Sequence, residues 1–403
     1  MAEKRRRQRR AVGEDVTEEP CDSESCSGRS SHCVYPTLKR EDLPPVSYYL
    51  STGSTLLDLA ISDRLPGGAG GGRITHIYGD NSTAKTLLIQ EVMGAAQREG
   101  GTVILCDAEW AFDYGRAHLF GLDVGKWASE SYQDEQTEKE SKASDDKKKR
   151  MKFYQEQLAE CDGFLCRHPE SVESLFDCEI MGLVDAVKAG VLKPPIILAV
   201  DSLSALASIV ENEDDLDTAT YGITRAKMFS AGFRKYIKHL AKYKIAVVAV
   251  DQTRMDVGSP VKNKRTTSGG RSMGFYCSTG VLLSHVGYLS NKHEVKTGVK
   301  IKFIVKKNKI AAPFREGILD ILFDVGVDDV TANLEWLAGQ KEVDSKLEQS
   351  GAWYSWGEMK LGQGLDSAVR MVEREDMEED VEQEVKRVWE VIYSPSGRKK
   401  RHG

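Results

Sequence analysis

The chain has 403 residues, of which 40% are hydrophobic, and a formal net charge of −6. This length allows a substantial core divided between two or three domains, whereas the small net charge neither indicates nor excludes nucleic acid as a partner. No run reaches the ~20 apolar residues of a membrane span, which argues against a membrane-spanning protein.

The cysteines indicate the compartment. Eight cysteines in a chain of this length do not form a dense disulfide framework, and none belongs to a C-x-x-C pair. We therefore expect free thiols and a reducing compartment. Cys21, Cys26 and Cys33, with His32, are spaced unlike common zinc fingers, so we expect no zinc there.

The basic run 1–10 is not followed by an apolar segment, so we expect no secretory signal.

The first predicted part is a polar arm. Residues 1–46 are charged, lack periodic hydrophobicity and contain Pro44-Pro45 near their end, which predicts a disordered or loosely docked segment. Its basic run can neutralise phosphates or be a solvated tail.

Apolar strand-like runs alternate with helical ones across the next part, 47–328. Such a pattern predicts an α/β core with a mostly parallel sheet covered on both faces. The strand-like runs are 74–78, 102–107, 195–201, 245–251, 281–286 and 299–306.

The most informative motif lies between the first two runs. It is the octet Gly79, Asp80, Asn81, Ser82, Thr83, Ala84, Lys85 and Thr86, which has the pattern of a phosphate-binding loop between a strand and a helix. In such a loop Lys85 contacts the β- and γ-phosphates of ATP, and the Thr86 hydroxyl ligates Mg²⁺. Ala84 replaces the usual glycine, and because alanine tolerates ordinary helical dihedrals we expect the loop to form. A chance match remains the alternative.

Acidic and amide side chains follow three other apolar runs. Glu109 is placed to orient an attacking water or to pair with a neighbouring cation. Asp201 is placed to hold Mg²⁺ through water or to cap a helix. Gln252 is placed to contact the γ-phosphate and to respond to its presence.

Two charged segments interrupt the core. Residues 132–155 carry many charges of both signs and predict an exposed, partly helical insertion, either an interaction site or, as we favour, a solvated hairpin. The segment 254–271 combines glycines with several cations, which is typical of a mobile loop that grips a phosphodiester backbone, although incidental surface charge would give the same pattern.

The last part, 329–394, predicts a small α+β domain. We expect helices over 330–337, 343–349 and 368–392, interrupted by an aromatic turn or short strand at 350–356. Residues 395–403 form a basic tail.

The order of these motifs resembles the RecA family of strand-exchange recombinases. The resemblance rests on Ser51 to Ser54, the phosphate loop, Asp107 to Glu109, Asp201-Ser202, Gln252 to Met255 and Thr266 to Gly270; Lys307 to Phe314, Gly351 to Ser355 and Gly362 to Gly364 are similar to the bacterial branch. It covers about residues 47–370.

The resemblance implies a filament on single-stranded DNA with ATP between subunits, homologous pairing with duplex DNA, and strand exchange. Glu109 then matches the hydrolytic carboxylate, with Lys85 and Gln252 also catalytic. Asp113 and Arg116 match the adenine-facing positions, where Arg116 replaces a tyrosine, and Lys307 and Lys309 match lysines that reach the neighbour's ATP.

The resemblance also implies DNA-binding residues. These are Arg254, Lys262, Lys264, Arg265, Gly269, Gly270 and Arg271. Phe275 matches an aromatic that relays state between subunits, or is part of the core. The charged insertion, and a basic tail where an acidic one is usual, depart from the bacterial pattern and predict a bacteriophage-encoded or otherwise divergent member. Because the acidic tail restrains duplex binding in the family, the basic tail predicts that this protein binds duplex DNA readily.

Two other functions stay open. A nucleotide-gated DNA-binding scaffold with little hydrolysis is compatible with Ala84 and Arg116, and a helicase motor of the same core would form a ring. For each of them, and for the recombinase, we expect a cytoplasmic protein of a bacterial cell or a phage-infected host.

Overall fold

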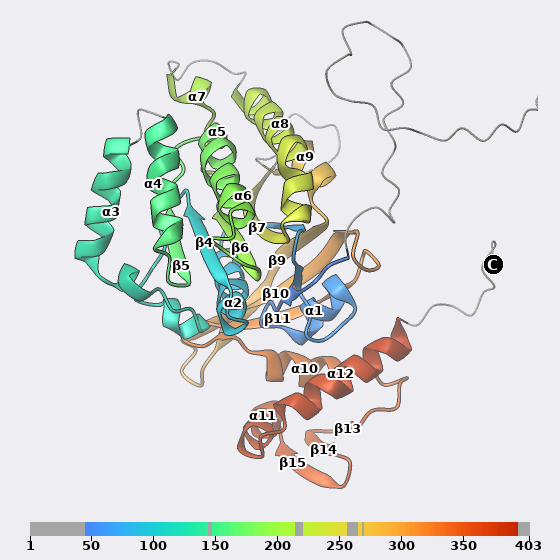
Figure 1. The fold of residues 1–403 in the computed structure, drawn as a ribbon. Coiled ribbons are helices and arrows are strands. Elements are labelled where there is room, and N and C mark those ends of the chain that lie inside the picture. The colour runs from blue at the N-terminus through green and yellow to red at the C-terminus, as the bar shows by residue number, and fades with distance from the viewer. Residues whose placement is uncertain (1–44, 144–146, 214–220, 256–264, 268–269, 394–403) are drawn as a thin grey trace, which may run out of the picture. The chain divides into compact units, whose positions relative to one another are not determined.

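The computed structural model describes residues 45–143, 147–213, 221–255, 265–267 and 270–393. Within them, the main sheet has the strand order β12-β11-β10-β9-β3-β7-β6-β4-β5, and β8 pairs with β7. Figure 1 labels β4 to β7 and β9 to β11 of this sheet. The strands from β9 to β5 in that order are parallel, and β8, β10, β11 and β12 are antiparallel to their neighbours. The predicted α/β class with a mostly parallel sheet is confirmed.

The strands of this sheet include the six runs that the sequence predicted, except that β6 begins at Ile196 and not at Pro195. They are β3 (Ile74–Gly79), β4 (Thr102–Asp107), β5 (Phe164–Arg167), β6 (Ile196–Asp201), β7 (Ile245–Met255), β8 (Arg265–Thr267), β9 (Thr279–Ser290), β10 (Lys296–Asn308), β11 (Glu316–Leu322) and β12 (Gly326–Val327). A small separate pair is formed by β1 (Tyr49–Leu50) and β2 (Ala69–Gly70).

Helices connect the strands. They are α1 (Thr55–Ser62), α2 (Lys85–Arg98), η2 (Ala117–Phe120), η3 (Gly125–Ala128), α3 (Glu130–Ala143), α4 (Lys147–Ala159), α5 (Val172–Ser174), the π-helical η4 (Leu175–Ile180), α6 (Met181–Lys188), α7 (Ile209–Glu213), α8 (Tyr221–Lys242) and α9 (Gly270–Tyr276).

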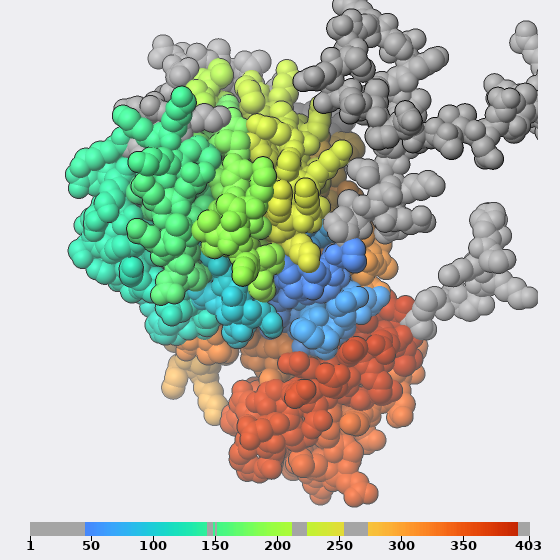
Figure 2. Space-filling model, in the orientation of Figure 1, coloured from blue at the N-terminus to red at the C-terminus, as the bar shows by residue number. Residues whose placement is uncertain are grey.

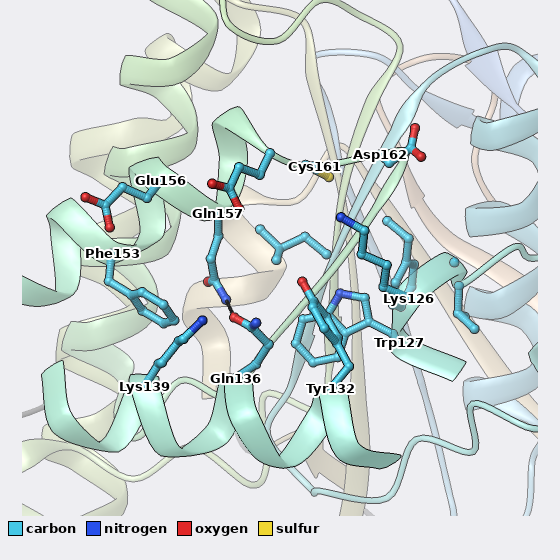
Figure 3. Close-up of a pocket in the computed structure, with 15 residues that line it drawn as sticks. Lys126, Trp127, Tyr132, Gln136, Lys139, Phe153, Glu156, Gln157, Cys161 and Asp162 are labelled. Carbon is cyan, nitrogen blue, oxygen red and sulfur yellow. Dashed lines mark hydrogen bonds between the residues drawn. The ribbon is translucent and has the colours of Figure 1, made fainter. Parts of the chain in front are cut away.

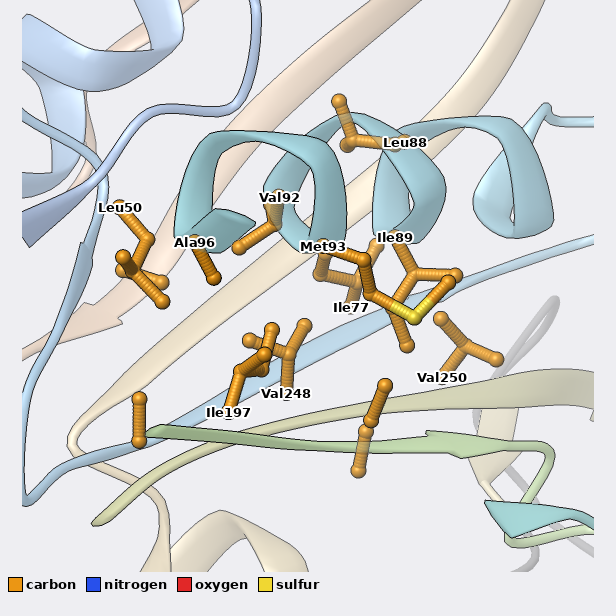
Figure 4. Packing of buried hydrophobic residues seen from close by; sticks show 14 of the residues in the cluster. Leu50, Ile77, Leu88, Ile89, Val92, Met93, Ala96, Ile197, Val248 and Val250 are labelled. Carbon is orange, nitrogen blue, oxygen red and sulfur yellow. The ribbon is translucent and has the colours of Figure 1, made fainter. Parts of the chain in front are cut away.

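The part of the core that positions the candidate site lies between α2 and the central strands. Ile89, Met93 and Ala96 recur at the spacing of one helix face and point toward Ile197 and Val248 on β6 and β7 (Figure 4). Each fully buried aliphatic side chain stabilises the fold by about 1.5–3 kcal/mol. This packing fixes the beginning of α2 against the ends of the strands, which is where the candidate site lies.

Parallel pairing brings the carboxyl ends of four strands together. Gly79 at the end of β3 is in register with Gln252 on β7, and Asp107 at the end of β4 is in register with Asp201 on β6. Ligands of open α/β sheets bind at this edge. The topology alone therefore assembles the residues that the sequence singled out.

The charged insertion forms a helical hairpin of α3 and α4 beside β5, at the edge of the sheet (Figure 1). Ion pairs four residues apart, such as Glu135 with Lys139 and Glu138 with Lys142, lie on the surface of α3. Such pairs stabilise a polar helix by about 0.2–0.5 kcal/mol each. The predicted helical character of the insertion is confirmed.

The C-terminal part is a small α+β domain, as predicted. It contains α10 (Asp329–Gly339), β13 (Leu347–Ser350), β14 (Trp353–Trp356), β15 (Met359–Gln363), α11 (Leu365–Arg374) and α12 (Glu378–Ile392), and its three strands form an antiparallel sheet. Figure 2 shows α12, in red, against the blue residues of the core, and Arg315 pairs with Asp63 (2.8 Å) beside Trp389 of α12.

Two of our predictions for this domain are wrong. The segment 343–349 is not a helix, because Leu347 to Ser350 pair with β14 and the backbone N–H of Lys346 donates to the Glu384 carboxylate (2.9 Å). The helix expected over 368–392 begins earlier and is two helices, since the chain turns at Glu375 to Met377.

Several expectations fall outside the described residues. They concern most of the N-terminal arm with Cys21, Cys26 and Cys33, and the basic tail. The five cysteines that the structure describes are free thiols. None of its helices combines the length and the apolar character needed to cross a bilayer.

Candidate active site

The phosphate-loop octet connects β3 to α2. β3 ends at Gly79 and α2 begins at Lys85, as the strand, loop and helix interpretation requires. A Cβ at Gly79 would lie 2.5 Å from the carbonyl oxygen of Leu283, so this strand end accepts only glycine. Ala84 provides no side-chain cap for α2, which leaves the first N–H groups of the helix available for an anion.

Ala84 adopts the left-handed conformation, with φ 57° and ψ 27°. We expected ordinary helical dihedrals here, and that expectation is wrong. An L-residue in this region brings its Cβ close to the following carbonyl oxygen, which costs about 1–2 kcal/mol. The loop keeps the glycine-type conformation and accommodates the methyl group at that cost.

Lys85 lies inside the loop with 9% of its surface exposed. Its Nζ donates to the carbonyl oxygens of Asp80 (2.7 Å) and Gly79 (3.2 Å). Burial lowers the pKa of Lys85, and the nearby carboxylates of Asp201 and Glu109 oppose this shift. A partly desolvated ammonium group at a helix N-terminus is suited to bind phosphate.

Thr86 and Asp201 form the candidate Mg²⁺ position. The Thr86 hydroxyl donates to the Asp201 carboxylate at 2.7 Å. Burial raises the pKa of Asp201 to about 6, and the Thr86 hydrogen bond lowers it in part. A divalent cation would offset this unfavourable burial of negative charge, and hydroxyl and carboxylate oxygens are ligands that Mg²⁺ prefers.

Thr86 and Asp201 therefore fit Mg²⁺, but they do not enclose it. Among the described residues, no group of three or more His, Cys, Asp and Glu side chains is arranged to hold a metal. Phosphate oxygens and water would supply the remaining ligands, which is the usual arrangement for Mg²⁺ at a nucleotide.

Glu109 points into the same site from the end of β4. Its Oε1 accepts a hydrogen bond from the Ser202 hydroxyl at 2.5 Å, and the Ser202 oxygen is 2.7 Å from that of Ser204. Among the residues that the structure describes, the hydrogen-bond partner of the Glu109 carboxylate is a hydroxyl and no salt bridge involves it, which disfavours the salt-bridge alternative. Our sequence interpretation gave Ser202 no role, although its position directly after Asp201 was the available signal.

These side chains line one open cavity of about 320 Å³. Its lining consists of Asn81, Ser82, Thr83, Ala84, Lys85, Thr86, Leu87, Glu109, Asp201, Ser202 and Gln252. The structure thus brings together most of the predicted phosphate-loop residues, the predicted metal residues and all three predicted catalytic residues.

β7 connects this cavity to the segment 254–271, called the basic segment below. Gln252 lines the cavity, and the next residue, Thr253, donates from its hydroxyl to the carboxylate of Asp80 in the phosphate loop. β7 then continues to Met255 and pairs with β8. A change at the phosphate loop can therefore be transmitted along a single strand; the sequence interpretation did not identify Thr253.

The predicted adenine and neighbour-contacting residues lie outside the cavity lining. The Arg116 guanidinium donates to the carbonyl oxygen of Phe323, and its backbone N–H donates to Asp113 (3.2 Å). Lys307 donates to the carbonyl oxygens of Gly274 and Phe275. The backbone N–H of Lys309 donates to the carbonyl oxygen of Ser278, directly before β9.

The predicted DNA-binding residues are only partly described. The backbone places Arg254 on β7, Arg265 on β8 and Gly270 and Arg271 on α9. Lys262, Lys264 and Gly269 lie outside the described residues. Phe275 is 73% exposed, so it is not a core residue.

Two family models match the chain. The model of the RecA N-terminal domain matches residues 38–140 and 155–328, and the model of the RecA C-terminal domain matches residues 343–390. The interruption of the first match lies within the α3–α4 hairpin.

Proposed function

The chain belongs to the RecA family, and we propose that it is a DNA-dependent ATPase that forms filaments on single-stranded DNA and catalyses homologous pairing and strand exchange. We propose the boundaries 47–328 for the ATPase core and 329–394 for the C-terminal domain. The inferred place of action is the cytoplasm of a bacterial or phage-infected cell.

One observation carries this proposal: a phosphate-loop lysine, a hydroxyl–carboxylate pair and a hydrogen-bonded glutamate converge on one cavity that a single strand joins to the basic segment. Lys85, Thr86, Asp201 and Glu109 all line this cavity, and Glu109 follows β4, which pairs with the strand that ends at Asp201. A site that hydrolyses nucleoside triphosphates needs this combination of a phosphate-binding lysine, Mg²⁺ ligands and a carboxylate that orients water.

Each residue has a distinct role in the proposed reaction. Lys85 binds the β- and γ-phosphates, and Thr86 and Asp201 hold Mg²⁺, which when bound neutralises charge on the phosphate oxygens. Glu109 orients a water molecule and accepts its proton as the water oxygen attacks the γ-phosphorus. The bond between this phosphorus and the bridging oxygen breaks, which gives ADP and phosphate. Ser202 holds the Glu109 carboxylate in place.

Coupling to DNA follows from the strand connection. Gln252 lies beside the phosphate position, and the segment after it carries the proposed DNA contacts, among them Arg254 and Arg271. Lys307 contacts the end of α9, the helix that closes this segment. We propose that Lys307 and Lys309 then exchange these contacts for the ATP of a neighbouring subunit in the filament.

The test compares ATP hydrolysis and nucleotide binding with and without single-stranded DNA. In Lys85→Ala we expect nucleotide binding and hydrolysis to be lost together. Glu109→Gln should keep nucleotide and DNA binding while kcat falls at least about 100-fold, because only the proton acceptor is removed. Glu99→Gln, an exposed change at the end of α2, is the matched control and should resemble the unchanged protein.

Other outcomes identify the alternatives. ATP-dependent DNA binding without turnover in the unchanged protein would indicate a nucleotide-gated scaffold. Rings in electron micrographs, together with unwinding of forked DNA, would indicate a helicase motor. Turnover that survives Glu109→Gln would contradict the assigned mechanism.

A further inference from the structure

The residue directly after Glu109 has an unusual environment. Trp110 is 63% exposed and has a positive φ of 55°, which bulky residues seldom adopt. Its ring stacks on that of His168, with centroids 3.8 Å apart and an interplanar angle of 16°. Such a conformation persists only where surrounding contacts hold it, and this stack is such a contact.

The turn that carries Glu109 is held from two sides. On one side the Asp107 carboxylate accepts hydrogen bonds from the backbone N–H groups of Glu109 (3.2 Å) and Phe112 (2.9 Å). On the other side lies the Trp110–His168 stack. The Trp110 ring thereby links the turn that carries Glu109 to His168, which follows β5 and is 8% exposed.

His168 lies beside the inserted hairpin. Glu140 of α3 pairs with Nη2 of Arg167 (3.1 Å), and its other carboxylate oxygen lies 3.7 Å from the His168 Nδ1, which is beyond hydrogen-bond distance. Gln157 of α4 accepts a hydrogen bond from Arg167 Nη1 (2.7 Å). Both helices of the hairpin thus meet the end of β5 at one polar cluster.

The cluster has a rigid anchor in the core. Arg167 is almost fully buried, and its Nε donates to Glu179 (3.2 Å). Nearby, a hydrogen bond of 2.9 Å between Gln136 and Gln157 joins α3 to α4 beside a cavity of about 220 Å³, which residues of α3, α4, η3 and β5 line (Figure 3). The hairpin therefore contacts the end of β5 through specific polar atoms.

We propose that the inserted hairpin positions the hydrolytic carboxylate: Glu140 pairs with Arg167 and packs beside His168, His168 holds Trp110 by stacking, and Trp110 fixes the turn that places Glu109. This inference rests on the proposed ATPase function. Glu140, His168 and Trp110 are positioning residues, because none of them lines the nucleotide cavity. The insertion is thereby part of the active-site scaffold rather than a solvated appendage.

The experiment measures kcat and KM for ATP in the full-length protein with saturating single-stranded DNA. His168→Ala should lower kcat about tenfold at nearly constant KM, because the carboxylate is misplaced while nucleotide contacts remain. His168→Phe keeps an aromatic ring against Trp110 and should restore most of the activity. Glu140→Gln should give a smaller loss of kcat.

Glu138→Gln is the matched control for Glu140→Gln. Glu138 lies on the same helix, is 68% exposed and pairs with Lys142 four residues away. Its loss should leave kcat unchanged. A loss of kcat in Glu138→Gln equal to that in Glu140→Gln would overturn the proposal. The loss would then come from removing any negative charge from α3 and not from the contacts of Glu140.

A second measurement does not depend on activity. The ¹⁹F resonance of fluorotryptophan at position 110, assigned with Trp110→Phe, should shift in His168→Ala and Glu140→Gln but not in Glu138→Gln. An unshifted resonance with unchanged kcat in His168→Ala would overturn the proposal, as would a loss that His168→Phe fails to restore. If the unchanged protein hydrolyses no ATP, the proposed function fails instead, and the resonance still tests the contacts.

Discussion

Asp201→Asn should make the nucleotide-free protein more stable at neutral pH while it impairs hydrolysis. Burial raises the pKa of this carboxyl from 3.8 to about 6. The Asp201 carboxyl therefore binds its proton more tightly in the folded protein than in the unfolded chain. The free energy of unfolding consequently falls as the pH rises from about 4 to about 6. Above that range the ionised carboxylate destabilises the folded state, by an amount that the pKa difference sets at no more than about 3 kcal/mol.

Partial exposure of the carboxylate reduces this amount to about 1–2 kcal/mol through solvent screening. Asparagine removes the charge and keeps an oxygen that accepts the hydrogen bond from Thr86. We therefore expect Asp201→Asn to raise the free energy of unfolding by about 1–2 kcal/mol at pH 7.5 and to have no effect near pH 4.

The assay is guanidinium-induced unfolding in EDTA at pH 4, 5, 6 and 7.5. Asp58 and Glu382 also have pKa values raised by burial, to about 7, so the difference between variant and unchanged protein isolates Asp201. Asp324→Asn, at an exposed carboxylate, is the control. With saturating Mg²⁺ and ATP the order of stability should reverse. A variant that is less stable at pH 7.5, or a difference independent of pH, would refute the reasoning.

Three further predictions concern single contacts. Ala84→Gly should raise the free energy of unfolding by about 0.5–1 kcal/mol, because glycine adopts the left-handed conformation without the steric cost that alanine has there. This gain exceeds the stability lost through the greater conformational entropy of glycine in the unfolded chain. A variant that is less stable would contradict the strain at Ala84. Ser202→Ala should lower kcat about tenfold with ATP binding unchanged, because Glu109 loses its hydrogen-bond donor; equal kcat would exclude this role. Arg167→Met should destabilise by about 3–5 kcal/mol, since Glu179 would remain buried without its cation, and a loss below about 1 kcal/mol would contradict that pairing.

The catalytic edge of the sheet was predictable because one regularity determines it. Parallel strands end at the same edge, so residues that follow consecutive apolar runs meet in space although they are distant in sequence. Asp107 and Asp201 are adjacent for this reason, and so are Gly79 and Gln252. No side-chain detail was needed for these pairs.

The errors arose where pairing or sterics overrode local preference. The segment 343–349 has residues that favour a helix, but the aromatic strand Trp353–Trp356 offers a partner that turns part of it into β13. At Ala84 the residue type suggested ordinary dihedrals, whereas the loop between a fixed strand end and a packed helix imposes the left-handed ones. In both cases the deciding contact lies outside the local sequence.

The hairpin was a different case. Charges of both signs predicted a solvated helix, and most side chains of α3 are indeed on the surface. What the pattern did not contain is that one of its glutamates, Glu140, faces Arg167 and His168, because a polar helix has no hydrophobic face that marks its buried side. The buried arginine was the usable signal: Arg167 ends an apolar strand, and a guanidinium there requires carboxylates from neighbouring elements. Looking for those carboxylates would have directed attention to the insertion, and from there to the turn that carries Glu109.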